Sequence, residues 1–78
     1  MDIKPRIIEV ISNLLKVKPQ EIQDNVRLCD GLGVDSTEMV EMVITLEKAF
    51  GVKLSAKDIT KFSTVNEIEK VIQSKISQ

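Results

Sequence analysis

The sequence has no histidine, tryptophan or tyrosine, and it has one cysteine and two phenylalanines among its 78 residues. Without histidine, the usual Cys/His zinc sites cannot be assembled, and a serine hydroxyl lacks its most common activating base. The single cysteine, Cys29, excludes an internal disulfide and is expected to be a small buried thiol. We therefore expect a cytoplasmic protein that is not an enzyme and binds no metal ion.

Long apolar runs are also absent. No segment approaches the length of a membrane span, and the N-terminal stretch MDIKPRIIEV lacks the apolar core of a secretory signal. A chain of 78 residues is long enough for one compact core, but too short for a core plus a deep active site. We expect one monomeric domain over residues 1–78, with a core built from Ile, Val and Leu.

The net charge of −1 hides an uneven distribution of charge along the chain. Residues 20–51 carry seven acids and two bases, whereas the rest of the chain carries nine bases and five acids. An acidic central segment argues against nucleic acid as a partner, because phosphates need a basic face. It favours an electropositive protein partner, although charge alone fits an ordinary solvated surface better than a docking surface.

The apolar pattern predicts an all-α fold: a small four-helix bundle with three longer helices, one short helix and a long loop between the first two helices. The first helix is expected from Ile3 to about Val17, with Pro5 in its first turn. From Lys18 to Gly33 the helical periodicity fades and turn-forming residues gather, which predicts the long loop. Its apolar residues are expected to anchor it to the core; they are Ile22, Val26, Leu28 and Leu32.

Three later helix starts share a polar cap followed three residues on by an acid, which can satisfy the amides of a first helical turn. The pairs are Asp35 and Glu38, Ser55 and Asp58, and Thr64 and Glu67. They predict a helix over 36–50 that ends at Gly51, a short helix over 56–61, and a final helix over 65–76. The inward face of the final helix is expected to contain Ile68, Val71, Ile72 and Ile76.

The helix predicted over residues 36–50 has one contiguous apolar face. On a helical wheel that face contains Met39, Met42, Val43, Leu46 and Phe50. Val40 and Ile44 fall outside it, beside acidic residues. They either form an exposed docking surface or pack under the long loop, and the sequence leaves both possibilities open.

Ser36 occupies the first position of this helix, directly after Asp35. Its hydroxyl is expected to project into solvent, where an attached anion such as a phosphodiester would meet the positive end of the helix dipole. Position alone does not decide this role, because most serines at helix starts are only capping or solvated residues. The residues argue against catalysis, because the nearest lysine after Ser36 is Lys48, three turns away along the helix.

The stretch LGVDSTEMVEMVITLEKAFGVKL resembles the centre of acyl carrier proteins, in which a Leu-Gly-x-Asp-Ser turn leads into an acidic helix ending near a Phe. The other predicted elements follow the family's order along nearly the whole chain. The resemblance implies that a separate, Mg²⁺-dependent phosphopantetheinyl transferase attaches 4′-phosphopantetheine from coenzyme A to Ser36. The arm would then carry acyl groups as thioesters in fatty acid, polyketide or related lipid biosynthesis.

The resemblance also implies a docking surface for acyl-processing enzymes with basic faces, such as synthases, transferases and ligases. Asp35 corresponds to the acid before the modified serine. The expected partner-binding residues are Thr37, Glu38, Val40, Glu41, Ile44 and Glu47. Met39 and Met42 either line a pocket that shelters an acyl chain or fill the core.

Three positions depart from the family's usual pattern. Thr37 stands where the family usually has Leu, while Gly31 and Lys48 stand where it often has acids. These changes predict a less apolar and less acidic docking face, which fits a specialised pathway. An aminoacyl carrier, an unmodified helical adaptor and a minor hydrolase using Ser36 are the alternative functions.

Overall fold

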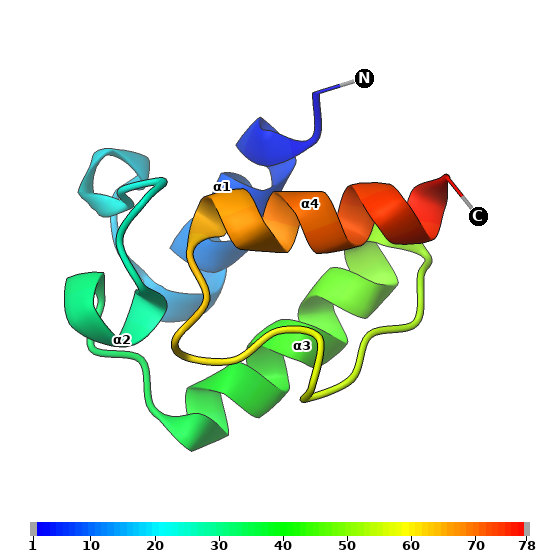
Figure 1. The fold of residues 1–78 in the computed structure, drawn as a ribbon. Helices are drawn as coiled ribbons and strands as arrows, with labels where there is room; N and C mark the ends of the chain where they lie inside the picture. Colours follow the sequence, from blue (N-terminus) through cyan, green and yellow to red (C-terminus); the bar gives the residue numbers. More distant parts are fainter. Residues whose placement is uncertain (1, 78) are drawn as a thin grey trace.

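The computed structural model describes residues 2–77, which fold into an all-α bundle. Its helices are α1 (Lys4–Leu15), α2 (Leu28–Gly31), α3 (Ser36–Phe50) and α4 (Val65–Ile76), with a 3₁₀ turn at Pro19–Glu21. α1 packs against both α3 and α4, while α2 lies at one side of the bundle, in the long connection (Figure 1). The predicted fold class, with three longer helices and one short helix, is confirmed.

The starts of α3 and α4 are fixed by the predicted capping pairs. The Glu38 N–H donates to Asp35 Oδ1 (2.8 Å), and the Asp35 N–H donates to Glu38 Oε1 (3.2 Å). Thr64 and Glu67 exchange the same two bonds at the start of α4 (3.2 and 2.9 Å). Since four amides at each helix start lack partners within the helix, each reciprocal pair satisfies two of them and fixes the entry of the chain. α3 ends as predicted at Gly51, whose φ of 65° is left-handed.

The prediction of a short helix over residues 56–61 is wrong, because this segment forms consecutive turns. Ser55 and Asp58 do interact locally, since the Ser55 N–H and hydroxyl both donate to Asp58 Oδ2 (2.9 and 3.1 Å). The Thr60 N–H then donates to the Ser63 hydroxyl, and the Ser63 N–H donates to the Thr60 carbonyl. These bonds close a second turn in place of a continuous helical ladder.

The short helix of the fold is α2, which lies inside the predicted long loop. The Leu28 N–H donates to the Ser63 carbonyl (3.0 Å), and the Cys29 N–H donates to the Lys61 carbonyl (2.8 Å). Two amides that a four-residue helix would leave without partners are therefore satisfied by a segment more than thirty residues away. The prediction of a buried thiol is wrong, because Cys29 is only half-buried.

The core forms where α1, α3 and α4 meet, and buried residues outside these three helices complete it; they are Ile3, Ile22, Leu28, Val34, Leu54 and Ile59. Its completely buried aliphatic and methionine side chains are Ile7, Ile11, Met42, Leu46, Val65, Ile68 and Ile72. Ile22 and Leu28 anchor the long connection as predicted, while Val26 and Leu32 are half-buried. The inward placement of Ile76 is wrong: it is the last residue of α4, projects past the core and is 44% exposed.

Asp58 makes the stability of the fold sensitive to acid. Its carboxylate accepts hydrogen bonds from Ser55 and lies 3.7 Å from Lys75 Nζ. The Ser55 backbone bond is the main cause that lowers the pKa of Asp58 below its ordinary value of 3.8. A lowered folded-state pKa stabilises the fold above the unfolded-state pKa, and this stabilisation is lost as the pH falls through the folded-state value.

We therefore expect Asp58→Asn to lower the free energy of unfolding at pH 7, and the gap from wild type to narrow as the pH falls below 3.8. Urea unfolding followed by circular dichroism at a series of pH values measures both effects. Glu41→Gln is the matched control, because the exposed Glu41 carboxylate makes no hydrogen bond or ion pair within residues 2–77. A gap for Asp58→Asn that does not depend on pH would contradict this assignment.

Candidate functional site

Ser36 is the first residue of α3, and its side chain is exposed, as predicted. Within residues 2–77, its hydroxyl makes no hydrogen bond. The neighbouring carboxylates of Asp35 and Glu38 are engaged with each other's backbone amides and do not bond to Ser36. Ser36 is therefore neither the cap of α3 nor a structural serine, and its hydroxyl is available for covalent modification.

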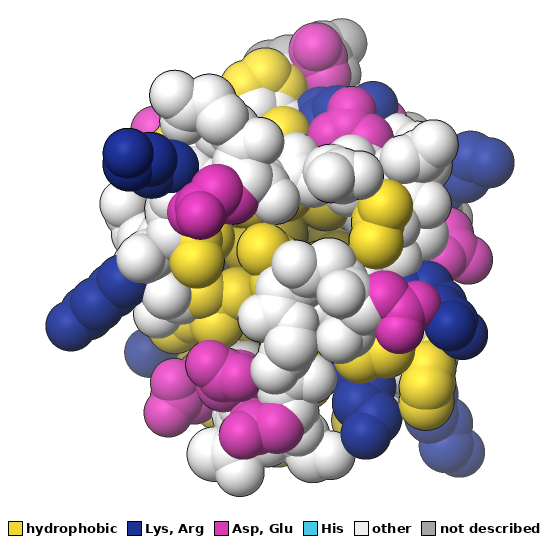
Figure 2. Space-filling model, turned by 90° about the vertical axis from the view of Figure 1, so that its left-hand side faces the viewer, with side chains coloured by type: hydrophobic (Ala, Val, Ile, Leu, Met, Phe, Trp, Pro, Cys, Tyr) yellow, Lys and Arg dark blue, Asp and Glu magenta, His cyan; other side chains and the backbone are white. Residues whose placement is uncertain are grey.

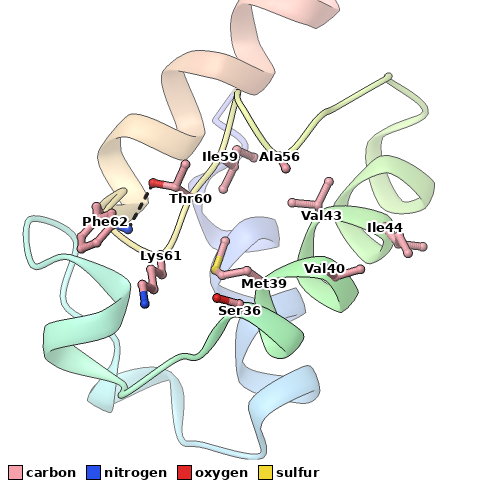
Figure 3. Close-up of a pocket in the computed structure, with 10 residues that line it drawn as sticks. All are labelled: Ser36, Met39, Val40, Val43, Ile44, Ala56, Ile59, Thr60, Lys61 and Phe62. Atoms are coloured by element: carbon pink, nitrogen blue, oxygen red, sulfur yellow. Dashed lines mark hydrogen bonds between the residues drawn. The ribbon is translucent and has the colours of Figure 1, made fainter.

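An apolar pocket of about 430 Å³ opens beside Ser36, between α3 and the turns of residues 56–62 (Figure 3). Its α3 wall consists of Ser36, Met39, Val40, Val43 and Ile44, and its opposite wall consists of Ala56, Ile59, Thr60, Lys61 and Phe62. This volume lies in the range of small-molecule sites in proteins. Met39 is buried in the core and also lines the pocket, whereas Met42 is fully buried in the core and does not line the pocket.

Val40 and Ile44 lie on the rim of this pocket. They are 58% and 46% exposed, respectively, although both are large apolar side chains. Their exposure excludes one of the two possibilities that the sequence left open, because neither residue packs under the long loop. A docking role for them stays a prediction. Exposed apolar side chains at the mouth of an apolar pocket form a continuous surface that a ligand or partner can cover.

The remaining predicted docking residues differ in their surroundings. Thr37 and Glu41 are exposed, whereas Glu38 is half-buried in its capping role. Glu47 is also half-buried, and its Oε2 accepts a hydrogen bond from the Leu54 N–H (3.0 Å). Glu47 therefore holds the backbone at Leu54 against α3. The sequence did not predict this structural role for Glu47. Figure 2 shows a group of acidic side chains beside apolar surface on the face of the molecule that it presents.

The wall of the pocket opposite α3 was not predicted, and it includes Lys61 and Phe62. Phe62 is 56% exposed, and its ring centroid lies 5.5 Å from Lys61 Nζ and 5.9 Å from Arg27 Cζ. Both distances fall within the range of cation–π contacts. An aromatic residue in the otherwise polar stretch TKFST is the one sequence signal that pointed here.

Within residues 2–77, no side chain is hydrogen-bonded to the Ser36 hydroxyl as an activating base would be. Lys61 is half-buried and lines the same pocket, but within residues 2–77 it makes no hydrogen bond to the Ser36 hydroxyl. In the same part of the chain, no group of three His, Cys, Asp or Glu side chains is placed to hold a metal ion. None of the helices described has the length and apolar character needed to cross a membrane.

The fold and site together define a small helical domain with a free serine at a helix start and an apolar pocket beside it. Such a site suits the covalent attachment and shelter of a flexible group. The family model described as the phosphopantetheine attachment site matches residues 5–72. The chain therefore belongs to this family, and its prosthetic group is 4′-phosphopantetheine.

Similar proteins cover almost the whole chain. An acyl carrier protein of Thermotoga maritima is 35% identical over 75 residues, covering 96% of this chain and 93% of the relative. An acyl carrier protein of Wolinella succinogenes is 31% identical over 68 residues, with 87% and 90% covered. One from Buchnera aphidicola is 30% identical over 74 residues, with 95% and 94% covered. These relatives are named as carriers rather than catalysts.

Proposed function

We propose that Ser36 carries the 4′-phosphopantetheine arm and that the protein works as an acyl carrier. The observation that supports this assignment is the exposed, unbonded hydroxyl at the start of α3, beside an apolar pocket. The amides of the first helical turn and the helix dipole favour a negatively charged phosphodiester at this position. When attached, the arm supplies a thiol that holds acyl groups as thioesters.

The remaining residues of the site bind and position this arm and its cargo. A separate phosphopantetheinyl transferase would join the Ser36 oxygen to the phosphopantetheine phosphate of coenzyme A, with 3′,5′-ADP leaving. Met39, Val43 and Ile59 would remove an acyl chain from water when it enters the pocket. The direct test is attachment of the arm by a transferase, which should modify wild type and leave Ser36→Ala unmodified.

The exposed part of α3 is the proposed docking surface for partner enzymes. Val40 and Ile44 offer apolar contacts, and Glu41 offers an unpaired carboxylate to a basic partner. Charge of this kind speeds and orients the encounter, while small apolar contacts allow rapid release. We propose a monomer that works in the cytoplasm and meets the transferase and acyl-processing enzymes through this surface.

We expect Glu41→Lys to slow encounter with a phosphopantetheinyl transferase, lowering kcat/KM for arm attachment roughly tenfold at low salt. The free energy of unfolding should change little, because the Glu41 side chain makes no hydrogen bond within residues 2–77. Attachment rates measured at subsaturating carrier concentration test this. Glu9→Lys on α1 matches the change in net charge away from Ser36 and should keep the wild-type rate. Equal attachment rates for both variants would show that Glu41 is not part of the docking surface.

The alternative of an unmodified helical adaptor makes a different prediction for the same surface. In an adaptor, partner binding would survive Ser36→Ala, and no arm would be found on the protein from its own cell. For an aminoacyl carrier, the arm would be present and would carry an amino acid. The identity of the group released from the native thioester therefore separates these functions and identifies the pathway.

A further inference from the structure

Lys61 is the one charged residue among the side chains that line the pocket beside Ser36. It belongs to the wall opposite α3, at the same end of the pocket as Ser36 (Figure 3). Its ammonium stacks on the Phe62 ring at 5.5 Å, and no carboxylate within residues 2–77 lies at ion-pair distance from it. The site thus contains a lysine without an anionic partner in the part of the chain that the structure describes.

The neighbouring cation, Arg27, differs in this respect. Its Nε lies 2.7 Å from Asp30 Oδ2, and this hydrogen bond is the main cause that raises the pKa of Arg27. The charge of Arg27 is therefore largely balanced by its own carboxylate partner. Among the pocket-lining residues within 2–77, Lys61 is the cation that has no carboxylate at ion-pair distance.

The backbone that carries Lys61 is held in place by α2. The Lys61 carbonyl accepts the Cys29 N–H (2.8 Å), and the Ser63 carbonyl accepts the Leu28 N–H (3.0 Å). The Phe62 N–H also donates to Thr60 Oγ1 (3.2 Å). A lysine on a fixed backbone loses less conformational freedom when it binds an anion than one on a mobile loop.

An arm on Ser36 places a negatively charged phosphodiester between acidic side chains on α3 and a basic side chain across the pocket. On the α3 side, Asp35 precedes the serine and Glu38 lies half a turn further along the helix, so their carboxylates repel the new charge. Across the pocket, Lys61 attracts it. The charges therefore favour an arm that leaves Ser36 toward the pocket rather than outward past the acidic side chains.

We infer that Lys61 is the counter-ion of the arm's phosphodiester and directs the arm along the pocket, which makes it a positioning residue. This inference rests on the proposed attachment at Ser36. It gives α2 a role as well, because this helix fixes the turn from which Lys61 reaches the pocket. Lys61 is thereby distinct from the acidic α3 residues, whose proposed role is to meet partner enzymes.

The test compares wild type with Lys61→Gln, Lys61→Arg and Lys57→Gln, each loaded with an octanoyl-phosphopantetheine arm. Lys57 is the matched control because it is exposed on the same connecting segment and does not line the pocket. Cleavage of the thioester by hydroxylamine reports how well the pocket shelters it. The ³¹P resonance of the phosphodiester reports the charge beside it.

We expect Lys61→Gln to speed hydroxylamine cleavage about threefold at low salt, the size typical of one partly exposed ion pair. The difference in cleavage rate between Lys61→Gln and wild type should disappear at 1 M salt. At about this concentration, the attraction between opposite charges is screened over a distance of about 3 Å. Lys61→Arg should restore the wild-type rate, and Lys57→Gln should not change it. The ³¹P resonance should move in Lys61→Gln and not in Lys57→Gln.

Unchanged cleavage and an unchanged ³¹P resonance in Lys61→Gln would overturn the role of Lys61 and leave the carrier function standing. A faster cleavage that persists at 1 M salt would also overturn it, because loss of packing rather than charge would then be the cause. Intact mass is checked first. A wild-type protein that accepts no arm would instead overturn the proposed function and this inference with it.

Discussion

Ser36→Ala is expected to receive no arm when it is produced together with a broad-specificity phosphopantetheinyl transferase. Wild type should gain the mass of one 4′-phosphopantetheinyl group under the same conditions. The reason is chemical, because the phosphodiester needs an oxygen at this position and alanine has none. The variant should fold normally, since the Ser36 hydroxyl makes no hydrogen bond within residues 2–77 and is exposed.

The control for this experiment is Ser74→Ala, which removes an exposed serine from α4, away from the pocket. It should be modified as fully as wild type. Intact-mass spectra of the three proteins give the result directly, and circular dichroism confirms that each variant is folded. If the Ser36→Ala variant gained the mass of an arm, the attachment site would have to be a residue other than Ser36.

Leu46→Ala is expected to destabilise the fold more than a change at any exposed position of α3. Leu46 is completely buried in the middle of the core face of this helix. Replacing a buried leucine with alanine costs about 2–5 kcal/mol, because apolar contacts are lost and a cavity remains. Small domains are stable by only about 5–15 kcal/mol in total, so this variant should be partly unfolded under mild conditions.

Ile44→Ala is the matched control on the same helix, because Ile44 is 46% exposed on the pocket rim. Its free energy of unfolding should stay within about 1 kcal/mol of wild type, as for most surface changes. Urea unfolding followed by circular dichroism measures both variants. Similar losses of unfolding free energy in Leu46→Ala and Ile44→Ala would show that α3 is not buried along the predicted face.

The parts of the fold that depend on local chemistry were predicted well from the sequence. The caps at Asp35 and Thr64 each involve a partner three residues away, and the stop at Gly51 needs only a left-handed residue. The core face of α3 follows from helical periodicity alone. Four of its five predicted residues are buried, and the fifth, Phe50, is half-buried against the core.

The errors arose where distant segments decide the local structure. α2 exists because its first amides bond to Lys61 and Ser63, and no pattern near residues 28–31 encodes those partners. Residues 56–61 have a good helix-start pair, but side-chain bonds of Thr60 and Ser63 divert the chain into turns. A cap pair predicts a first turn, while continuation of the helix depends on the next residues in the chain and on the surface against which they pack.

The candidate site divides in the same way. Ser36 and the exposed residues Val40 and Ile44 follow from position on one helix and from the family resemblance. The opposite wall of the pocket, including Lys61 and Phe62, comes from a segment more than ten residues further along the chain. Its place beside Ser36 is a tertiary property, so the sequence did not predict this wall. Of the α3 residues that line the pocket, the sequence offered a pocket role only to Met39, with core filling as the alternative.

The most direct test of the carrier function is the intact mass of the wild-type protein isolated from its own cell, followed by peptide mapping. We expect a mass that exceeds the polypeptide by one 4′-phosphopantetheinyl group, with or without an acyl group, located on the peptide that contains Ser36. A protein found only at the mass of the bare polypeptide, or one with its arm on a different residue, would contradict this account.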